Sequence, residues 1–141
     1  MKAIIIMGST SDQNHADKIT TVLDDFGVGH EVHAASAHKN PERVLEIIRS
    51  VKEEDSVVFV TIAGRSNALS GFVAANCNKP TLGCPPFKDK VDMSINIHST
   101  LQMPSKTCLL YTSDAPDDTP CVDIGGRRII KKKRGGGGGG G

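Results

Sequence analysis

Three short polar clusters, at residues 8–12, 36–39 and 64–67, carry residue types suited to binding and transforming a small anionic molecule. In the first, Gly8 lets the backbone turn just before an expected helix, whose unpaired N–H groups favour a phosphate. Ser9 and Ser11 add hydroxyl donors, and Asp12 either caps the helix or accepts hydrogen bonds from sugar hydroxyls. Together these features favour a ribose phosphate. Plain helix capping by Ser11 and Asp12 is the competing interpretation.

The second cluster places His38 beside Lys39 at the end of an expected strand. Histidine titrates near neutral pH and is the commonest proton-transfer group, worth roughly 10²- to 10⁴-fold in rate when correctly placed. Lys39 offers a point charge to a phosphate or carboxylate. The competing interpretations are a structural histidine and a solvated lysine. The other histidines fall on expected helices or a strand and are interpreted as structural or exposed: His15, His30, His33 and His98.

The third cluster, residues 64–67, again precedes an expected helix and offers backbone N–H donors beside Gly64. Arg65 adds a fixed cation, and Ser66 and Asn67 add short polar side chains. Such a loop suits a carboxylate or CO2. An N-cap with a surface arginine is the alternative.

Alternating apolar runs and amphipathic segments position these clusters. Strands are expected at residues 3–7, 31–35, 56–62 and 81–84. The first helix follows residue 12 and ends at Gly27, and its expected apolar face comprises Ala16, Ile19, Val22, Leu23 and Phe26. The second starts at the Asn40-Pro41 cap, the third covers residues 68–75 and the fourth residues 91–103.

This order predicts an α/β fold, a flavodoxin-like doubly wound parallel sheet with helices on both faces, because parallel strands need right-handed crossover helices. The carboxyl ends of all strands then meet at one edge, where ligands of such folds bind. The three polar clusters are therefore expected on the same rim.

Composition narrows the class of protein. The 141 residues suffice for one domain, and 38% hydrophobic with 23% charged residues is a soluble globular balance. Residues 108–141 supply six of the 17 basic and four of the 16 acidic residues, so residues 1–107 carry a net charge of −1 and no nucleic-acid patch is expected. The apolar run at residues 3–7 is too short for a signal peptide or a membrane span, which favours a cytoplasmic protein. The four cysteines lack metal-site and disulfide-framework spacing, so no metal is expected.

The composition changes at the C-terminal end. Residues 108–111 are compatible with a fifth strand, but no amphipathic helix follows them. Runs of A and then G in the coding strand would account for residues 131–141, and residues 109–128 resemble translated sequencing adaptor. We therefore expect residues 1–107 to form an incomplete domain and residues 108–141 to be a non-native or disordered tail. Recovery of this tail in uninterrupted genomic DNA would contradict that expectation.

Five segments, in this order, resemble the aminoimidazole ribonucleotide carboxylase/mutase family of purine biosynthesis: residues 7–12, 36–39, 63–71, 84–86 and 101–104. The resemblance covers about residues 3–105. Lys39 and the Arg65-Ser66-Asn67 sequence resemble class II of the family rather than the class I mutases. Class II carboxylates 5-aminoimidazole ribonucleotide at C4 with CO2, without ATP, biotin or metal, and so without a cofactor.

The resemblance also implies roles for single residues. His38 is the proton acceptor, Ser9, Asp12, Ser36 and Lys39 hold the ribose phosphate, and Gly64 and Ser66 line the base and CO2 pocket. Further candidates for that pocket are Ser11, Arg65, Asn67, Ala68 and Leu69.

Family members continue past residues 101–104 into a further strand and helices and assemble as homo-tetramers or homo-octamers. The last strand and helices are therefore expected to be missing or replaced in this chain. Three hypotheses stay open: a carboxylase, with the N5-to-C4 mutase as its closest variant; a non-catalytic nucleotide-binding module; and an inactive fragment. The expected partners are a small nucleotide and CO2, not nucleic acid or a membrane.

Overall fold

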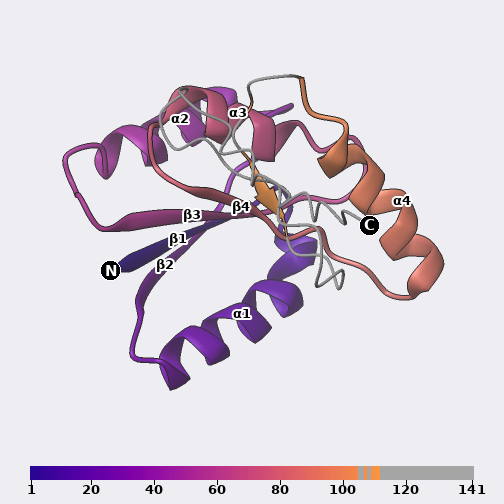
Figure 1. Cartoon of the computed structure of the whole chain (residues 1–141), viewed down its shortest axis with the longest axis horizontal. Helices are drawn as coiled ribbons and strands as arrows, with labels where there is room; N and C mark the ends of the chain where they lie inside the picture. The colour runs from indigo at the N-terminus through magenta and orange to yellow at the C-terminus, as the bar shows by residue number, and fades with distance from the viewer. Residues whose placement is uncertain (105–106, 108, 112–141) are drawn as a thin grey trace, which may run out of the picture.

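The protein, in a computed structural model, is described for residues 1–104, 107 and 109–111 (Figure 1). Five parallel strands form one sheet in the order β2-β1-β3-β4-β5. The strands are β1 Lys2–Met7, β2 Gly29–Ala34, β3 Val57–Ile62, β4 Thr81–Gly83 and β5 Leu110–Tyr111. The helices are the 3-10 turn η1 Thr10–Asp12 and α1 Gln13–Asp25, α2 Pro41–Ser50, α3 Ala68–Asn76 and α4 Lys90–Leu101. This confirms the predicted doubly wound α/β fold.

The central strand β1 builds both halves of the core because its side chains alternate between the two faces of the sheet. Ile4 and Ile6 are fully buried with residues of α2 and α3, among them Val44 and Val73. Ile5 is fully buried on the other face, where Ala16 of α1 packs. In Figure 1, α1 accordingly covers one face of the sheet, and α2 and α3 cover the other.

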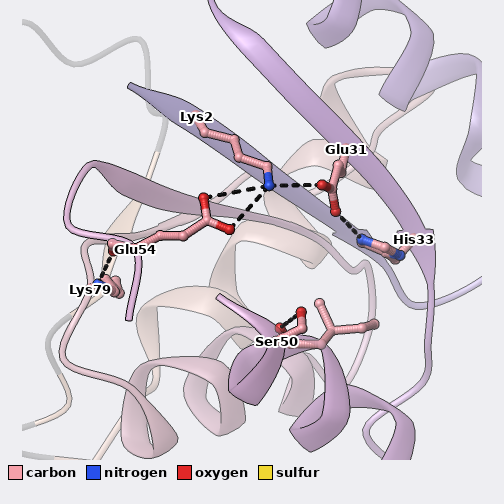
Figure 2. Close-up of polar contacts among 7 residues, drawn as sticks. Lys2, Glu31, His33, Ser50, Glu54 and Lys79 are labelled. Carbon is pink, nitrogen blue, oxygen red and sulfur yellow. Dashed lines mark hydrogen bonds and ion pairs between the residues drawn. The ribbon is translucent and has the colours of Figure 1, made fainter. Parts of the chain in front are cut away.

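A charged cluster joins the strands at the amino end of the sheet, opposite to the expected rim. Lys2 Nζ lies 2.8 Å from Glu31 of β2 and 3.3 Å from Glu54, which precedes β3 (Figure 2). Glu31 also contacts His33 at 3.2 Å, and Lys79 donates to the carbonyl of Glu54. The hydrogen bond from Lys2, followed by that from His33, lowers the pKa of Glu31. Such exposed pairs contribute little to the free energy of unfolding.

The expected apolar face of α1 was only partly correct. Ala16, Ile19 and Leu23 pack into the core as predicted, but Val22 is 52% and Phe26 79% exposed. Phe26 lies beyond the last residue of α1, and Val22 is rotated by about 120° from Ala16 at 100° per residue. The bounds of the strands and helices differ from the expected ones by at most two residues. For example, β2 starts at Gly29 instead of residue 31, and α4 ends at Leu101 instead of residue 103.

Helix α4 has an unusual orientation, since it buries polar residues and exposes apolar ones. Asn96 and Thr100 are 4% and 1% exposed, whereas Val91, Ile95 and Leu101 are 70%, 46% and 43% exposed. Apolar area on its outer side cannot hold this helix in place. Its inward side therefore contacts the protein through the polar residues Asn96 and Thr100, beside the half-buried Met93 and Ile97.

A fifth strand forms within residues 108–111, where the sequence was compatible with one. It comprises only Leu110 and Tyr111 and pairs with β4 through Leu82 and Gly83. Residues 112–141, and with them nearly all of the expected tail, lie outside the described residues. The expected domain boundary at residue 107 and the non-native origin of the tail stay predictions.

Two glycines make a matched test of packing between β4, α3 and α4. A Cβ on Gly83 would lie 2.9 Å from Thr100 Cγ2, the stiff branch of a buried threonine. On Gly71 it would lie 2.8 Å from Met103 Sδ, near the end of a flexible side chain. We expect Gly83→Ala to lower the free energy of unfolding by about 1–3 kcal/mol. Gly71→Ala, which also gains helix propensity, should be close to neutral. Urea unfolding of both variants tests this, and equal losses would contradict it.

Candidate functional site

A cavity of about 180 Å³ opens at the carboxyl edge of the sheet, where all three polar clusters meet. Its lining comes from the segments that follow β1, β2 and β3, as expected for a doubly wound fold. The predicted candidates that line it are Ser9, Asp12, Ser36, His38, Gly64, Arg65, Ser66, Ala68 and Leu69. Gly8, Ala37 and Ala63 also line it and were not among the candidates. Gly8 and Ala37 lie inside the first and second clusters, and Ala63 directly precedes the third; these positions were the only sequence signal for them.

Three predicted candidates, Ser11, Lys39 and Asn67, do not line this cavity. Ser11 Oγ donates to Ser9 Oγ at 2.8 Å, so its hydroxyl is engaged within the loop. Lys39 is exposed, and its backbone N–H donates to Ser36 Oγ at 3.3 Å. Asn67 is 5% exposed, and its carboxamide points into a buried network beneath the loop.

Ser9 caps the 3-10 turn η1 in the first loop, so the competing interpretation of capping by Ser11 and Asp12 is wrong. Ser9 is the N-cap of η1 and accepts from the N–H of Ser11 at 3.2 Å. Asp12 precedes α1 but makes no side-chain capping bond. Burial raises the pKa of Asp12, and the nearby His15 opposes that shift. The Asp12 carboxyl therefore faces the cavity without a capping role, which leaves it available to accept hydrogen bonds from a ligand.

The second loop holds His38 in a short turn that starts the next helix. Ser36 receives the N–H of Asn40 on its carbonyl oxygen at 2.8 Å, and this bond closes the turn. Asn40 then caps α2 by accepting from the N–H of Arg43 at 3.2 Å, as the Asn40-Pro41 pair predicted. The exposed His38 side chain lines the cavity between two fixed points, the end of β2 and the start of α2.

The third loop follows β3 and contains Ser66 at φ 53°, the only positive φ outside glycine in the described part of the chain. A left-handed residue that is not glycine costs energy, and the surrounding contacts must hold it in place. Asn67 caps α3 by accepting from the N–H of Ser70 at 3.0 Å. Arg65 is 73% exposed at its side chain and lies 3.6 Å from Asp92 of α4. The third loop therefore has both features of the alternative interpretation, an N-cap and a surface arginine. Its residues Gly64 and Ser66 nevertheless line the cavity.

A family model described as AIR carboxylase matches residues 2–115. This chain belongs to the AIR carboxylase family. The family resemblance drawn from residues 3–105 is confirmed, and the match extends eight positions past residue 107.

Relatives within the family differ in the reaction that they are named for. The phosphoribosylaminoimidazole carboxylase of Archaeoglobus fulgidus is 56% identical over 115 residues, which cover 82% of this chain and 63% of that protein. The N5-carboxyaminoimidazole ribonucleotide mutase of Methanocaldococcus jannaschii is 43% identical over 100 residues, covering 71% of this chain and 61% of that protein. This chain thus spans somewhat less than two thirds of these relatives.

The fold comparison agrees with the sequence comparison. The crystal structure of Treponema denticola PurE matches with a TM-score of 0.73 at 39% identity, over 79% of this chain and 70% of that one. No helix within the described residues is both long and apolar enough to cross a membrane. Among the same residues, no three His, Cys, Asp or Glu side chains gather closely enough to hold a metal ion.

Proposed function

We propose that this protein carboxylates 5-aminoimidazole ribonucleotide at C4 with CO2, reversibly, as a class II enzyme of purine biosynthesis that uses no cofactor. The observation that carries the proposal is the meeting of His38, Asp12 and the Gly64–Ser66 wall in one cavity of a family member. The cavity is smaller than the roughly 300–1,000 Å³ usual for a ligand site. It suits the reacting end of the nucleotide together with CO2.

The proposed chemistry needs positioning and one proton acceptor. C4 of the aminoimidazole is enamine-like, so its electron pair forms the new bond to the carbon of CO2 once the two are held together. The C4–H bond then breaks, its electrons restore the aromatic ring, and the proton passes to the imidazole of His38. In the reverse direction the same imidazole returns the proton to C4 and CO2 departs.

The remaining roles divide between the loops. Ser9, Asp12, Ser36 and Lys39 hold the ribose phosphate in this proposal, and Lys39, exposed at the rim, reaches it from outside the cavity. Gly64 and Ser66 form the wall for the base and CO2, with Ala68 and Leu69 as the apolar floor. All of these residues except Lys39 line the same cavity, which supports the roles proposed for them. Ser11 acts by donating a hydrogen bond to the hydroxyl of Ser9. Asn67 acts from beneath the third loop, where it accepts from the N–H of Ser70 and caps α3.

The direct test supplies 5-aminoimidazole ribonucleotide with ¹³C-bicarbonate and follows label in the C4 carboxylate by mass spectrometry. Incorporation without ATP supports the proposal. Because the relative from Methanocaldococcus jannaschii is named as a mutase, transfer of the carboxyl group from N5 to C4 is the second candidate function. Turnover of the N5-carboxylated nucleotide alone would favour that candidate. No turnover, with thermal stabilisation by the nucleotide, would favour a binding module.

For the intact protein we propose a homo-tetramer or homo-octamer. Support comes from apolar residues exposed on α1, directly after it and on α4, chiefly Val22, Phe26, Val91 and Ile95. Light scattering of the intact protein reports the mass, and a monomer would contradict this part of the proposal.

Asp12→Asn separates binding from stability. Because burial raises the pKa of Asp12, the folded state binds its proton more readily than the unfolded state does. The contribution of Asp12 to the free energy of unfolding therefore falls as pH rises from about its ordinary value of 3.8 through the higher folded value. At neutral pH we expect Asp12→Asn to be slightly more stable than the parent. It should also bind nucleotide roughly 10- to 100-fold more weakly, because a charged acceptor is lost.

Calorimetric titration of the nucleotide and thermal unfolding at pH 4 and pH 7 measure both effects. Asp25→Asn, at the exposed end of α1, is the matched control and should change neither. Unchanged nucleotide affinity in Asp12→Asn would remove Asp12 from the site.

A further inference from the structure

Helix α4 contacts the third loop of the cavity with its polar side. Ser99 lies half-buried between Asn96 and Thr100, which are almost fully buried, and all three residues make hydrogen bonds outside their own helix. None of the three lines the cavity. Their burial therefore points to a role in holding the residues that do line the cavity.

Ser99 spans the strained part of the loop. Its Oγ accepts from the backbone N–H of Asn67 at 3.3 Å, and its single proton lies within reach of two carbonyl oxygens, that of Gly64 at 3.0 Å and that of Asn96 in its own helix at 3.1 Å. The residues between these two anchor points are Arg65 and Ser66, and Ser66 has the positive φ. With its proton directed to Gly64, this one hydroxyl bonds to both ends of the left-handed turn.

A second group of contacts fixes the loop from below. Asn67 Nδ2 donates to Thr100 Oγ1 of α4 and to Ser70 Oγ of α3, each at 2.8 Å. Ser70 Oγ in turn lies 2.7 Å from Thr61 Oγ1 of β3, so the network reaches the central part of the sheet. Buried polar networks of this kind are rigid when every member has a partner.

The backbone at Gly64 lies directly against α4. A Cβ at Gly64 would stand 3.5 Å from Asn96 Oδ1, and Asn96 Nδ2 donates to the carbonyl oxygen of Pro86 at 2.6 Å. Gly64 and Ser66 both line the cavity. Helix α4 therefore meets the cavity wall at Gly64, through the hydrogen bond from Ser99 and the packing of Asn96 beside the Gly64 backbone.

We propose that Ser99 is a positioning residue for the reaction, which holds the Gly64–Ser66 wall in the left-handed turn that receives CO2. This inference rests on the proposed function for the identity of the ligand. The Ser99 side chain does not touch the reacting atoms. It acts through the carbonyl of Gly64 and the N–H of Asn67, on the CO2 side of the cavity and away from the residues proposed to hold the phosphate.

The test compares Ser99→Ala with Ser99→Thr, which keeps a hydroxyl, and with Ser94→Ala, which removes an exposed serine from the same helix. In Ser99→Ala we expect the KM for CO2 to rise about tenfold, the change that follows from losing hydrogen bonds of ordinary strength. The dissociation constant of the nucleotide should stay within about twofold, because the phosphate-side loops are untouched. Ser99→Thr should recover most of the loss, and Ser94→Ala should match the parent.

Amide hydrogen exchange gives a readout that does not require turnover. The amides of Asn67 and Ala68, which donate to Ser99 Oγ and to the carbonyl oxygen of Ser66, should exchange about tenfold faster in Ser99→Ala, while those of β1 keep their protection. Unchanged exchange in this loop, or an equal loss of protection in β1, would overturn the proposal. So would a parental KM for CO2 in Ser99→Ala.

Failure of the proposed function looks different. In that case the parent protein gives no carboxylated product, and the exchange comparison alone decides whether Ser99 holds the loop. Faster exchange confined to Asn67 and Ala68 then supports the positioning role, and parental exchange overturns it.

Discussion

Replacement of His38 by asparagine is expected to lower kcat for carboxylation by at least about 100-fold, the lower end of what a placed proton-transfer group contributes. Asparagine keeps a polar side chain of similar reach but cannot take up the C4 proton. Because His38 is exposed and lines the cavity from a turn, stability should stay at the parental value. The nucleotide should still bind with nearly parental affinity.

Three measurements on one preparation check this expectation: ¹³C incorporation, calorimetric nucleotide binding and thermal unfolding. His98→Asn is the matched control, since His98 lies exposed on α4 and outside the cavity. It should leave turnover unchanged. Near-parental turnover in His38→Asn would remove the proton-transfer role, and loss of nucleotide binding would assign His38 to binding instead.

Replacement of Asn67 by alanine is expected to lower the free energy of unfolding by about 2–4 kcal/mol, because several buried groups lose their partners together. The N–H of Ser70 loses its acceptor at 3.0 Å. The hydroxyls of Ser70 and Thr100 each lose a donor at 2.8 Å. For a domain of ordinary stability, about 5–15 kcal/mol, this is a large fraction.

Asn40→Ala provides the comparison, because Asn40 also caps a helix but is exposed. Loss of that cap alone should cost about 1 kcal/mol. Urea unfolding curves with equal slopes allow the two variants to be compared directly. Equal losses in Asn67→Ala and Asn40→Ala would mean that the inward hydrogen bonds of Asn67 add nothing to its capping bond.

The elements with strong local signals were predictable from the sequence. The apolar run at residues 3–7 and the β-branched run at residues 57–60 became the two central strands, both nearly fully buried. The Asn40-Pro41 cap started α2 where expected. In each case the signal comes from residues adjacent in the sequence. A continuous apolar run predicts a strand buried on both faces, and a capping residue predicts the start of a helix.

Other features were not predictable because their causes are distant in the chain. Thr61, Ser70 and Thr100 are almost fully buried, although threonine and serine are usually exposed. They are buried because they bond to one another or to Asn67, across separations of up to 33 residues. Val22 and Phe26 show the opposite outcome, since an apolar period in α1 did not bring them into the core.

The sequence by itself determined the family, the parallel α/β arrangement and the three polar loops that meet at one edge, because residue types at strand ends need only the chain order to bring them together. Only the tertiary structure decided which of those residues line the cavity. Ser11 and Asn67 turn to partners in the protein, while Ala37 and Ala63 line the cavity. The reason is that a hydroxyl or carboxamide satisfies its hydrogen bonds with whichever partner the packing of α1, α3 and α4 places nearest.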